Sequence, residues 1–470
     1  MPIRINLTKM TNSSDNSKQV NLYFSHLFKY QRIYLALLWL IVFSQPLLSN
    51  YFEEKPLLMG GESYYHLSSL GQTNNFNPLV FILNILPQKV HFLVPLIISA
   101  GMLCLFYFLA KRFNISEKQT FFIALFYVLT PTFIFSSVTL SSYSLFLVLV
   151  LLGTFLLLEN HWRKYFCLFP FAAAALFDTF SFILLLLFIA AYLFLLKKEK
   201  SFFSAAVMII LLCILIVSVN FLSLPFFLGP FEVQKGIGNL VSDLGGLSGV
   251  GFFTLLLAAI GLLIDWKKKS TLVSISLLIL FLVTYLFNSH TLFFLSLVII
   301  VLAALGFAKL LDQPWKLSLL QNITLFLLLL GIAFSSVAYL ERVSHYAPSK
   351  IDTEMLQWIR ENTDDEAIIL SAPENSYYIH QFAHRQPLFL LDQGYKQQYN
   401  LSQQIFTAFY IADLFPLLDK NHVSIIYISE DMKQTLPQDQ GFLFLLQNER
   451  FKLLHFRGEA EVWSFEEAKQ

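Results

Sequence analysis

Long apolar runs alternate with short polar segments over the first 340 residues. Most of these runs are about 16 to 22 residues long, the length of helix that crosses a hydrocarbon core of roughly 30 Å. The pattern predicts about eleven transmembrane helices, preceded by a cytosolic arm at residues 1–33. The apolar runs lie near residues 34–52, 91–110, 119–137, 141–158, 163–178, 180–196, 202–222, 251–265, 271–288, 290–311 and 318–340.

Basic residues divide unevenly between the two ends of these runs. With a cytoplasmic N-terminus, 18 of the 21 Lys and Arg residues in residues 1–340 fall on the cytoplasmic side, and only Lys55, Lys89 and Lys235 face outward. Cytoplasmic loops of membrane proteins carry this excess of positive charge. We therefore predict a multi-pass cell-membrane protein. An odd number of spans places everything after residue 340 outside the cell.

Two outward segments are much longer than a turn between neighbouring helices needs to be. Residues 53–89 form the first outward loop and residues 223–250 the second. Long loops in a compact fold are commonly functional or disordered. The first loop contains the stretch FNPLVFILNIL, which we interpret as a short amphipathic helix at the membrane interface.

The pattern changes after residue 340, and residues 341–470 contain 11 basic and 19 acidic residues. DTEMLQWIREN and IADLFPLLDKN have the apolar spacing of helices, whereas AIILSA and HVSIIYIS are typical of short buried strands. FKLLHF and EVWSF, separated by RGEA, predict a terminal hairpin. We expect two parts: a transmembrane domain at residues 34–340 and a small extracytoplasmic α/β domain at residues 341–470.

Composition excludes several functional classes. With 56% hydrophobic and 13% charged residues, the chain is too apolar for a soluble globular protein. A net charge of +1 gives no reason to expect nucleic acid as a partner. The three cysteines all lie within apolar runs and form no CxxC pair, so neither a disulfide framework nor a thiolate metal site is expected.

The sequence GESYYHL in the first outward loop carries candidate chemistry. One helical turn brings Glu62, Tyr65 and His66 near one another at the membrane face. A carboxylate in that place can take a proton from an acceptor or bind a divalent metal, and a histidine can donate to phosphate. The alternative is an interfacial helix in which Glu62 lies near the positive N-terminus while Tyr64 and Tyr65 belong to the aromatic belt.

A second polar cluster follows the first strand of the tail. Tyr377, Tyr378, His380, His384 and Arg385 recur at helical spacing. Since arginine offers a bidentate fork to phosphate, His384 and Arg385 are candidates for contact with an anionic substrate. Ordinary surface or core-edge residues are the alternative.

GESYYHL resembles the first external loop of archaeal oligosaccharyltransferase catalytic subunits, which are membrane glycosyltransferases of the GT-C superfamily. Further segments resemble the same family in the same order, and together they cover most of the chain. They are TPTFIFSSVTLSSYSL, VSDLGGLSGVGFFTLLLAAIGLL, HTLFFLSLVIIVLAALG, AIILSAPENSYYIHQFAHRQPLFLLDQGY and HVSIIYISED. The resemblance implies Asp243 as the acid of the second outward loop, where a solvated loop residue is the alternative. It also implies His290 in place of an arginine that binds lipid-linked phosphate.

Two departures from the family pattern bear on activity. Residues 141–144 read Ser-Ser-Tyr-Ser, without the acid pair of the family's second motif. Residues 372–376 read Ala-Pro-Glu-Asn-Ser where the family has the Trp-Trp-Asp-Tyr-Gly signature that binds the acceptor sequon. The candidate cofactor, Mn²⁺ or Mg²⁺, would bind at Glu62, and we predict weak or absent binding unless Asp178 or Asp243 completes a site.

The resemblance implies transfer of a sugar or oligosaccharide from a polyprenyl-phosphate or polyprenyl-diphosphate donor to an acceptor on the outer membrane face. Glu62 would act as base or metal ligand. Implied partners are the polyprenyl-linked donor, membrane lipids and a protein or glycan acceptor. Two alternatives stay open. One is a relative without catalysis that serves as a binding or assembly subunit, and the other is a transporter, although the sequence has neither internal repeats nor ionisable residues deep within a span.

Overall fold

The computed structural model describes residues 30–70, 77–113, 115–159, 161–175, 177, 240–246, 248–265, 269–286, 291–389 and 395–466. The chain divides into two compact units. The first unit comprises Met1–Pro46, Phe76–Leu79 and Leu93–Val343, and the second comprises Leu47–Asn75, Val80–Phe92 and Ser344–Gln470. Most of the described part of the first outward loop therefore belongs to the same unit as the predicted C-terminal domain.

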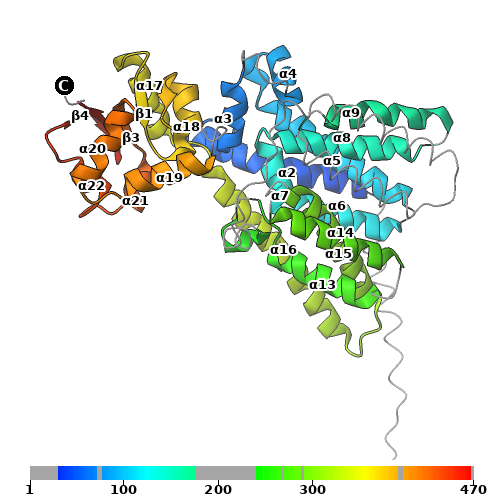
Figure 1. The fold of residues 1–470 in the computed structure, drawn as a ribbon. Coiled ribbons are helices and arrows are strands. Elements are labelled where there is room, and N and C mark those ends of the chain that lie inside the picture. The colour runs from blue at the N-terminus through cyan, green and yellow to red at the C-terminus, as the bar shows by residue number, and fades with distance from the viewer. Residues whose placement is uncertain are drawn as a thin grey trace, which may run out of the picture. The chain divides into compact units, whose positions relative to one another are not determined.

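The first unit is built from helices, shown in blue to yellow-green in Figure 1. Each of its longer helices coincides with a predicted apolar run. They are α2 (Gln31–Phe52), α5 (Leu93–Arg112), α6 (Glu117–Val128), α7 (Pro131–Val138), α8 (Ser142–Leu157), α9 (Leu168–Ala175), α13 (Phe252–Asp265), α14 (Lys269–Tyr285), α15 (Leu292–Asp312) and α16 (Ser318–Ser344), with 3₁₀ turns at η2 (His161–Cys167) and η3 (Ser242–Leu244).

Within the described residues, four helices are long and apolar enough to cross a membrane, namely α2, α5, α15 and α16. The α6 and α7 pair gives a fifth candidate span, and α8, α13 and α14 are shorter apolar helices. A polytopic helical membrane protein is thus confirmed. The count of eleven stays a prediction, because the runs at 180–196 and 202–222 lie outside the described residues.

The apolar run at residues 119–137 forms two helices instead of one continuous helix, and the bent pair remains a candidate for the single span that we predicted. α6 and α7 meet at an angle of 58°. Thr130 between them is extended and Pro131 begins α7. Proline lacks the N–H that would continue the α6 ladder, and it disfavours helical geometry in the residue before it. The bend therefore follows from Pro131.

We predict that α15 and α16 are joined on the cytoplasmic side and that the C-terminal domain is extracytoplasmic. Single cysteines replacing Lys316 and Asp439, which are both exposed, test this in a background without the native cysteines. A membrane-impermeant maleimide added to intact cells should label the cysteine at 439 and should reach the one at 316 only after permeabilisation. The reverse pattern would invert the topology.

The second unit contains a five-stranded sheet in the order β2-β1-β3-β5-β4. β1 (Ile368–Leu370) pairs in parallel with β2 (Gln386–Pro387) and with β3 (Val423–Ile428), whereas β5 (Ala460–Phe465) pairs antiparallel with β3 and β4 (Phe451–Arg457). The predicted strands and the terminal hairpin are therefore confirmed. Helices and turns complete the unit: α3 (Gly61–Ser68), α4 (Pro78–Ile85), η1 (Gln88–Val90), α17 (Lys350–Asn362), η5 (Pro373–Asn375), α18 (Ser376–Tyr378), η6 (Ile379–Ala383, a π-helical turn), α19 (Tyr395–Phe406), α20 (Ile411–Lys420), α21 (Glu430–Thr435) and α22 (Phe442–Leu445).

Each face of this sheet packs against helices. Ile425 and Tyr427 of β3 share a buried cluster with Met355 of α17. Ile426 of the same strand joins a second cluster that includes Leu414 of α20. Because successive side chains of a strand point to opposite faces, the continuous apolar run of β3 supplies both cores.

Candidate active site

The α3 helix of the second unit carries the candidate residues of the first outward loop. Gly60 precedes it with φ of 75°, a left-handed conformation that glycine adopts without steric cost. The Gly60 N–H donates to the carbonyl of Tyr346 at 2.9 Å. Glu62 lies in the first turn of α3, where the helix dipole favours a negative charge.

Aromatic rings join α3 to α18 and η6, which follow the first strand of the tail. The ring of Tyr64 lies 5.0 Å from that of Tyr378 and 5.4 Å from that of Phe382, measured between centroids. Tyr65 lies 5.2 Å from Tyr377. The loop and the tail thus share one packed interface within the second unit.

Tyr64 is a core residue of this interface. Its hydroxyl donates to the Leu58 carbonyl at 2.8 Å. Burial raises the pKa of the Tyr64 hydroxyl well above its usual value, because the phenolate would lose its solvation. Tyr64 therefore stays protonated and structural, and the adjacent residues of α3 are left to provide any chemistry.

Glu62 and His66 form a pair one turn apart. Nε2 of His66 lies 3.7 Å from Oε1 of Glu62. The imidazole is 3% exposed and the carboxylate 24% exposed, so solvent reaches the acid while the histidine is buried behind it. The ring of Tyr65 lies 5.1 Å from that of His66. The structure places these three candidates together, as the sequence spacing predicts.

This arrangement can move a proton. A partly exposed carboxylate beside an imidazole can accept a proton from a bound acceptor. The imidazole can donate a hydrogen bond to an anion. A metal site is a different matter. No group of three His, Cys, Asp or Glu side chains comes together within the described ranges. Glu62 and His66 alone do not make the donor set that Mn²⁺ or Mg²⁺ requires.

The second motif presents hydroxyl groups at the junction of α7 and α8. Ser141 and Ser144 are fully buried, and neither Oγ has a hydrogen-bond partner in the described part of the chain. Ser142 accepts a hydrogen bond of 3.0 Å from the side chain of Asn77. These residues offer neutral oxygens where the resembled family has carboxylates.

Asp243 fastens the end of the second outward loop to two helices. One carboxylate oxygen accepts the Phe252 N–H of α13 at 2.6 Å, and the other accepts the Ser335 hydroxyl of α16 at 2.5 Å. Asp243 is exposed, in keeping with the alternative of a solvated loop residue, and its carboxylate also ties the loop to α13 and α16. Asp243 belongs to the first unit, whereas Glu62 belongs to the second.

Arg385 has a different environment from the phosphate contact that we expected. The guanidinium is 5% exposed and donates to the carbonyls of Arg360 at 2.8 Å and Thr363 at 2.6 Å. It also pairs with Asp365 at 2.8 Å. Its donors are thus used at the C-terminal end of α17, where orphan carbonyls need partners. His384 beside it is exposed in a left-handed conformation.

Arg385→Ala should lower the free energy of unfolding by about 2–3 kcal/mol, because it strips charge-assisted hydrogen bonds from partly buried carbonyls. Thermal unfolding of the purified chain in detergent measures the loss. Arg360→Ala is the matched control, because it removes an exposed arginine side chain from the last turn of α17, the turn whose carbonyls Arg385 binds. Equal melting of both variants would show that water replaces the guanidinium.

Two candidates, Asp178 and His290, lie outside the described residues. The structure also adds residues that our sequence analysis missed. Phe382 contacts α3 from the tail, and Arg342 lies at the end of the last apolar helix beside a cavity. A basic residue two positions after the end of an apolar run is the signal that could have singled out Arg342.

No protein-family model and no curated protein matches the chain. Solved structures do. The oligosaccharyltransferase of Archaeoglobus fulgidus, tethered with an acceptor peptide containing the NVT sequon, has a TM-score of 0.59 at 14% identity over 87% of this chain and 70% of that one. Its apo form has a TM-score of 0.60 at 14% identity over 86% and 70% of the two chains.

A mycobacterial arabinofuranosyltransferase has a TM-score of 0.54 at 13% identity, over 92% of this chain and 41% of that one. These neighbours are GT-C glycosyltransferases, so the resemblance expected from the sequence is confirmed at the level of the fold. The chain spans less than half of the arabinofuranosyltransferase.

Proposed function

We propose that this chain is a membrane glycosyltransferase that moves a sugar or oligosaccharide from a polyprenyl-phosphate or polyprenyl-diphosphate donor to an acceptor on the outer membrane face. One observation carries the proposal. In a chain with this fold, Glu62 of the first outward loop is partly exposed to solvent and belongs to the same compact unit as the C-terminal tail. The neighbour with a tethered acceptor peptide makes a peptide one candidate acceptor.

In the proposed reaction, a nucleophilic oxygen or nitrogen of the acceptor attacks the anomeric carbon of the donor sugar. The bond from that carbon to the phosphate oxygen breaks, and the polyprenyl phosphate or diphosphate leaves with the electron pair. Glu62 accepts the proton that the acceptor loses. His66 donates to the anion and Tyr65 forms a wall of the site.

The remaining candidates have less support. His290 would contact the donor phosphate. Asp243 and Arg385 already bind protein groups, so they are proposed as substrate contacts only if the substrate displaces those partners. His384 is exposed and is proposed as a further substrate contact. We therefore base the proposal on the α3 residues.

The deciding experiment is a transfer assay with purified protein and a polyprenyl-linked donor, run with and without a chelator. The proposal expects glycosylated product in both arms, because described residues provide no three-ligand metal group. Product that disappears with chelator and returns with Mn²⁺ would reveal a metal site completed by residues such as Asp178. No product with any donor would favour the second candidate.

That second candidate is a binding or assembly subunit that has lost catalysis. The buried hydroxyls of Ser141 and Ser144 favour it, because they stand where the resembled family supplies carboxylates. Such a subunit would still bind the lipid-linked donor. Binding without transfer, together with association with an active transferase, distinguishes it from the enzyme.

A further inference from the structure

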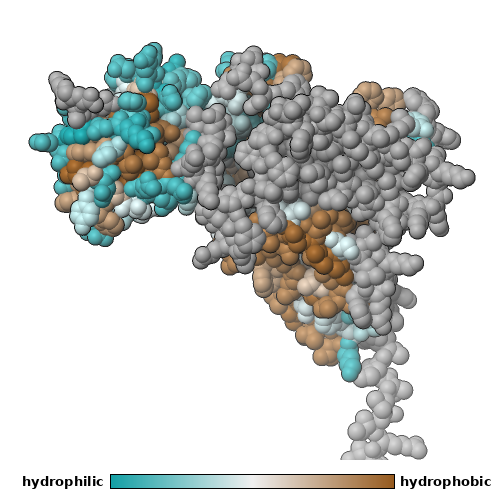
Figure 2. Space-filling model, in the orientation of Figure 1, coloured by the Kyte–Doolittle hydropathy of each residue, from teal (hydrophilic) through white to brown (hydrophobic). Residues whose placement is uncertain are grey.

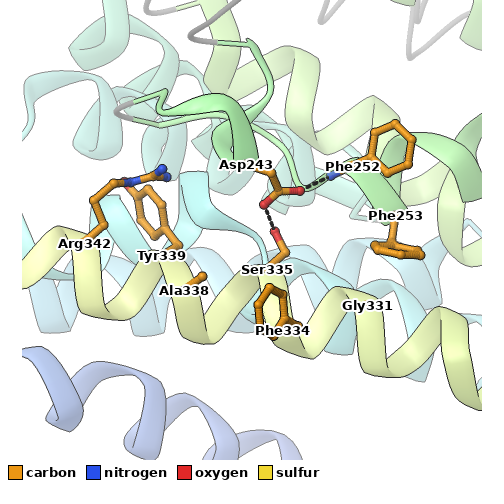
Figure 3. Close-up of a pocket in the computed structure, with 9 residues that line it drawn as sticks. All are labelled: Asp243, Phe252, Phe253, Gly331, Phe334, Ser335, Ala338, Tyr339 and Arg342. Carbon is orange, nitrogen blue, oxygen red and sulfur yellow. Dashed lines mark hydrogen bonds between the residues drawn. The ribbon is translucent and has the colours of Figure 1, made fainter.

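The first unit contains a cavity of about 360 Å³ where α16 passes the start of α13 and the residue 240–246 segment. Figure 3 shows the side chains around it. All of its lining residues belong to the first unit, and none belongs to the α3 site. Asp243, described above, closes one side of the cavity through its bonds to Phe252 and Ser335.

One face of α16 forms the floor of the cavity. Its lining positions are three or four residues apart, the spacing that puts side chains on one stripe of a helix. At a rise of 1.5 Å per residue, the stripe is roughly 16 Å long. It runs through Gly331, Phe334, Ser335, Ala338, Tyr339 and Arg342.

The Gly331 end of the stripe is apolar and lies at the protein surface. A Cβ at Gly331 would lie 2.4 Å from the Phe253 ring, so the glycine makes room for that ring beside the cavity. Phe334 is 73% exposed and Phe252 is 54% exposed. Figure 2 shows a brown, hydrophobic surface over the region of α13 and α16. Such a surface on a spanning helix faces lipid.

The other end of the stripe is cationic. The Arg342 guanidinium lies 5.1 Å from the Tyr339 ring centroid and donates from Nη2 to the Gly246 carbonyl at 3.2 Å. Its Nε is buried and makes no hydrogen bond to any residue that the structure describes. Asp243 does not use this charge, because its two oxygens accept from Phe252 and Ser335.

We propose that this cavity binds the phosphate end of a membrane lipid, with Arg342 as the anchor and the apolar tail along Phe334 and Phe252. An arginine with an unused N–H suits phosphate oxygens, since its planar fork can bond two of them. Arg342 lies in the last turn of a helix of 27 residues, at the level where lipid head groups lie. The inference concerns binding alone and stands whether or not the chain transfers a sugar.

Two sources supply this chemistry: a bilayer phospholipid and a polyprenyl phosphate. Titration of the detergent-purified full chain with farnesyl phosphate and with dioctanoyl phosphatidic acid separates them. Farnesol and dioctanoylglycerol are the controls that lack phosphate. We expect at least one phosphate to bind about tenfold or more tightly than its alcohol, and the tighter of the two phosphates identifies the source.

Arg342→Gln should abolish the preference for phosphate. Lys316→Gln also removes one positive charge, but just before the start of α16, and it should leave the preference unchanged. Ala338→Phe provides a second variant that keeps Arg342 but fills the cavity from an exposed position, and it should weaken both lipids. Native binding by Arg342→Gln and Ala338→Phe would overturn the proposal, as would equal binding of phosphates and alcohols by the natural chain. If Arg342→Gln fails to fold, Ala338→Phe decides alone.

Discussion

Replacement of Glu62 by Gln should reduce sugar transfer by about 10²–10⁴-fold while the protein keeps its melting temperature. The amide has nearly the shape of the carboxylate but cannot accept the acceptor's proton. Glu62 is 24% exposed, so the substitution buries no new polar group. Transfer per mole of folded protein, measured with a polyprenyl-linked donor, gives the result.

Glu361→Gln is the matched control, since it removes an exposed carboxylate from α17 of the same unit. Its transfer rate should equal that of the natural chain. Undiminished transfer by Glu62→Gln would place the base elsewhere. A lower melting temperature would instead point to the favourable position of Glu62 at the start of α3, an effect of only about 0.3–1 kcal/mol.

His66 provides a second measurement at the same site. His66→Gln removes the imidazole 3.7 Å from Glu62 and keeps a hydrogen-bonding side chain of similar reach. If His66 contacts the leaving phosphate, transfer should fall while acceptor binding persists. Loss of acceptor binding would move His66 to the acceptor side of the reaction.

The strongest sequence predictions rest on patterns that are local in the chain. Apolar length alone placed α5 and α15 within two residues of their observed bounds. The apolar run of β3 and the two segments flanking RGEA gave the strand and hairpin, because side-chain burial along a strand needs no knowledge of distant residues. Glu62, Tyr65 and His66 came together for the same reason, since one helical turn decides their spacing.

Contacts between residues far apart in the sequence could not be predicted from local patterns. The packing of Tyr64 against Tyr378 joins segments more than 300 residues apart, and no periodicity encodes it. Arg385 has the composition of a phosphate ligand, yet its guanidinium bonds to carbonyls at the end of α17. The pattern around each residue states which chemistry is possible, and the tertiary neighbours decide which is used.

The α13 and α15 helices approach so closely that their packing should be the most sensitive point of the first unit. A Cβ added at Gly306 would lie 2.5 Å from the Leu257 carbonyl oxygen and 2.8 Å from the backbone nitrogen of Gly261. A Cβ at Gly261 would lie 2.2 Å from the Leu302 carbonyl oxygen. Helices in membranes associate through small residues of this kind, since no hydrophobic force drives apolar surfaces together in lipid.

Gly306→Ala should therefore destabilise the chain by about 1–3 kcal/mol or more, because backbone atoms must move to admit the methyl group. Gly101→Ala is the control: its Cβ would meet only the Val148 methyls at 3.8 Å, an ordinary contact. Alanine is the better helix former by about 1 kcal/mol, so helix propensity alone would stabilise both variants. Thermal unfolding in detergent should show Gly306→Ala below the natural chain and Gly101→Ala at or above it. If the two variants melt together, propensity outweighs packing and α13 and α15 do not touch through their backbones.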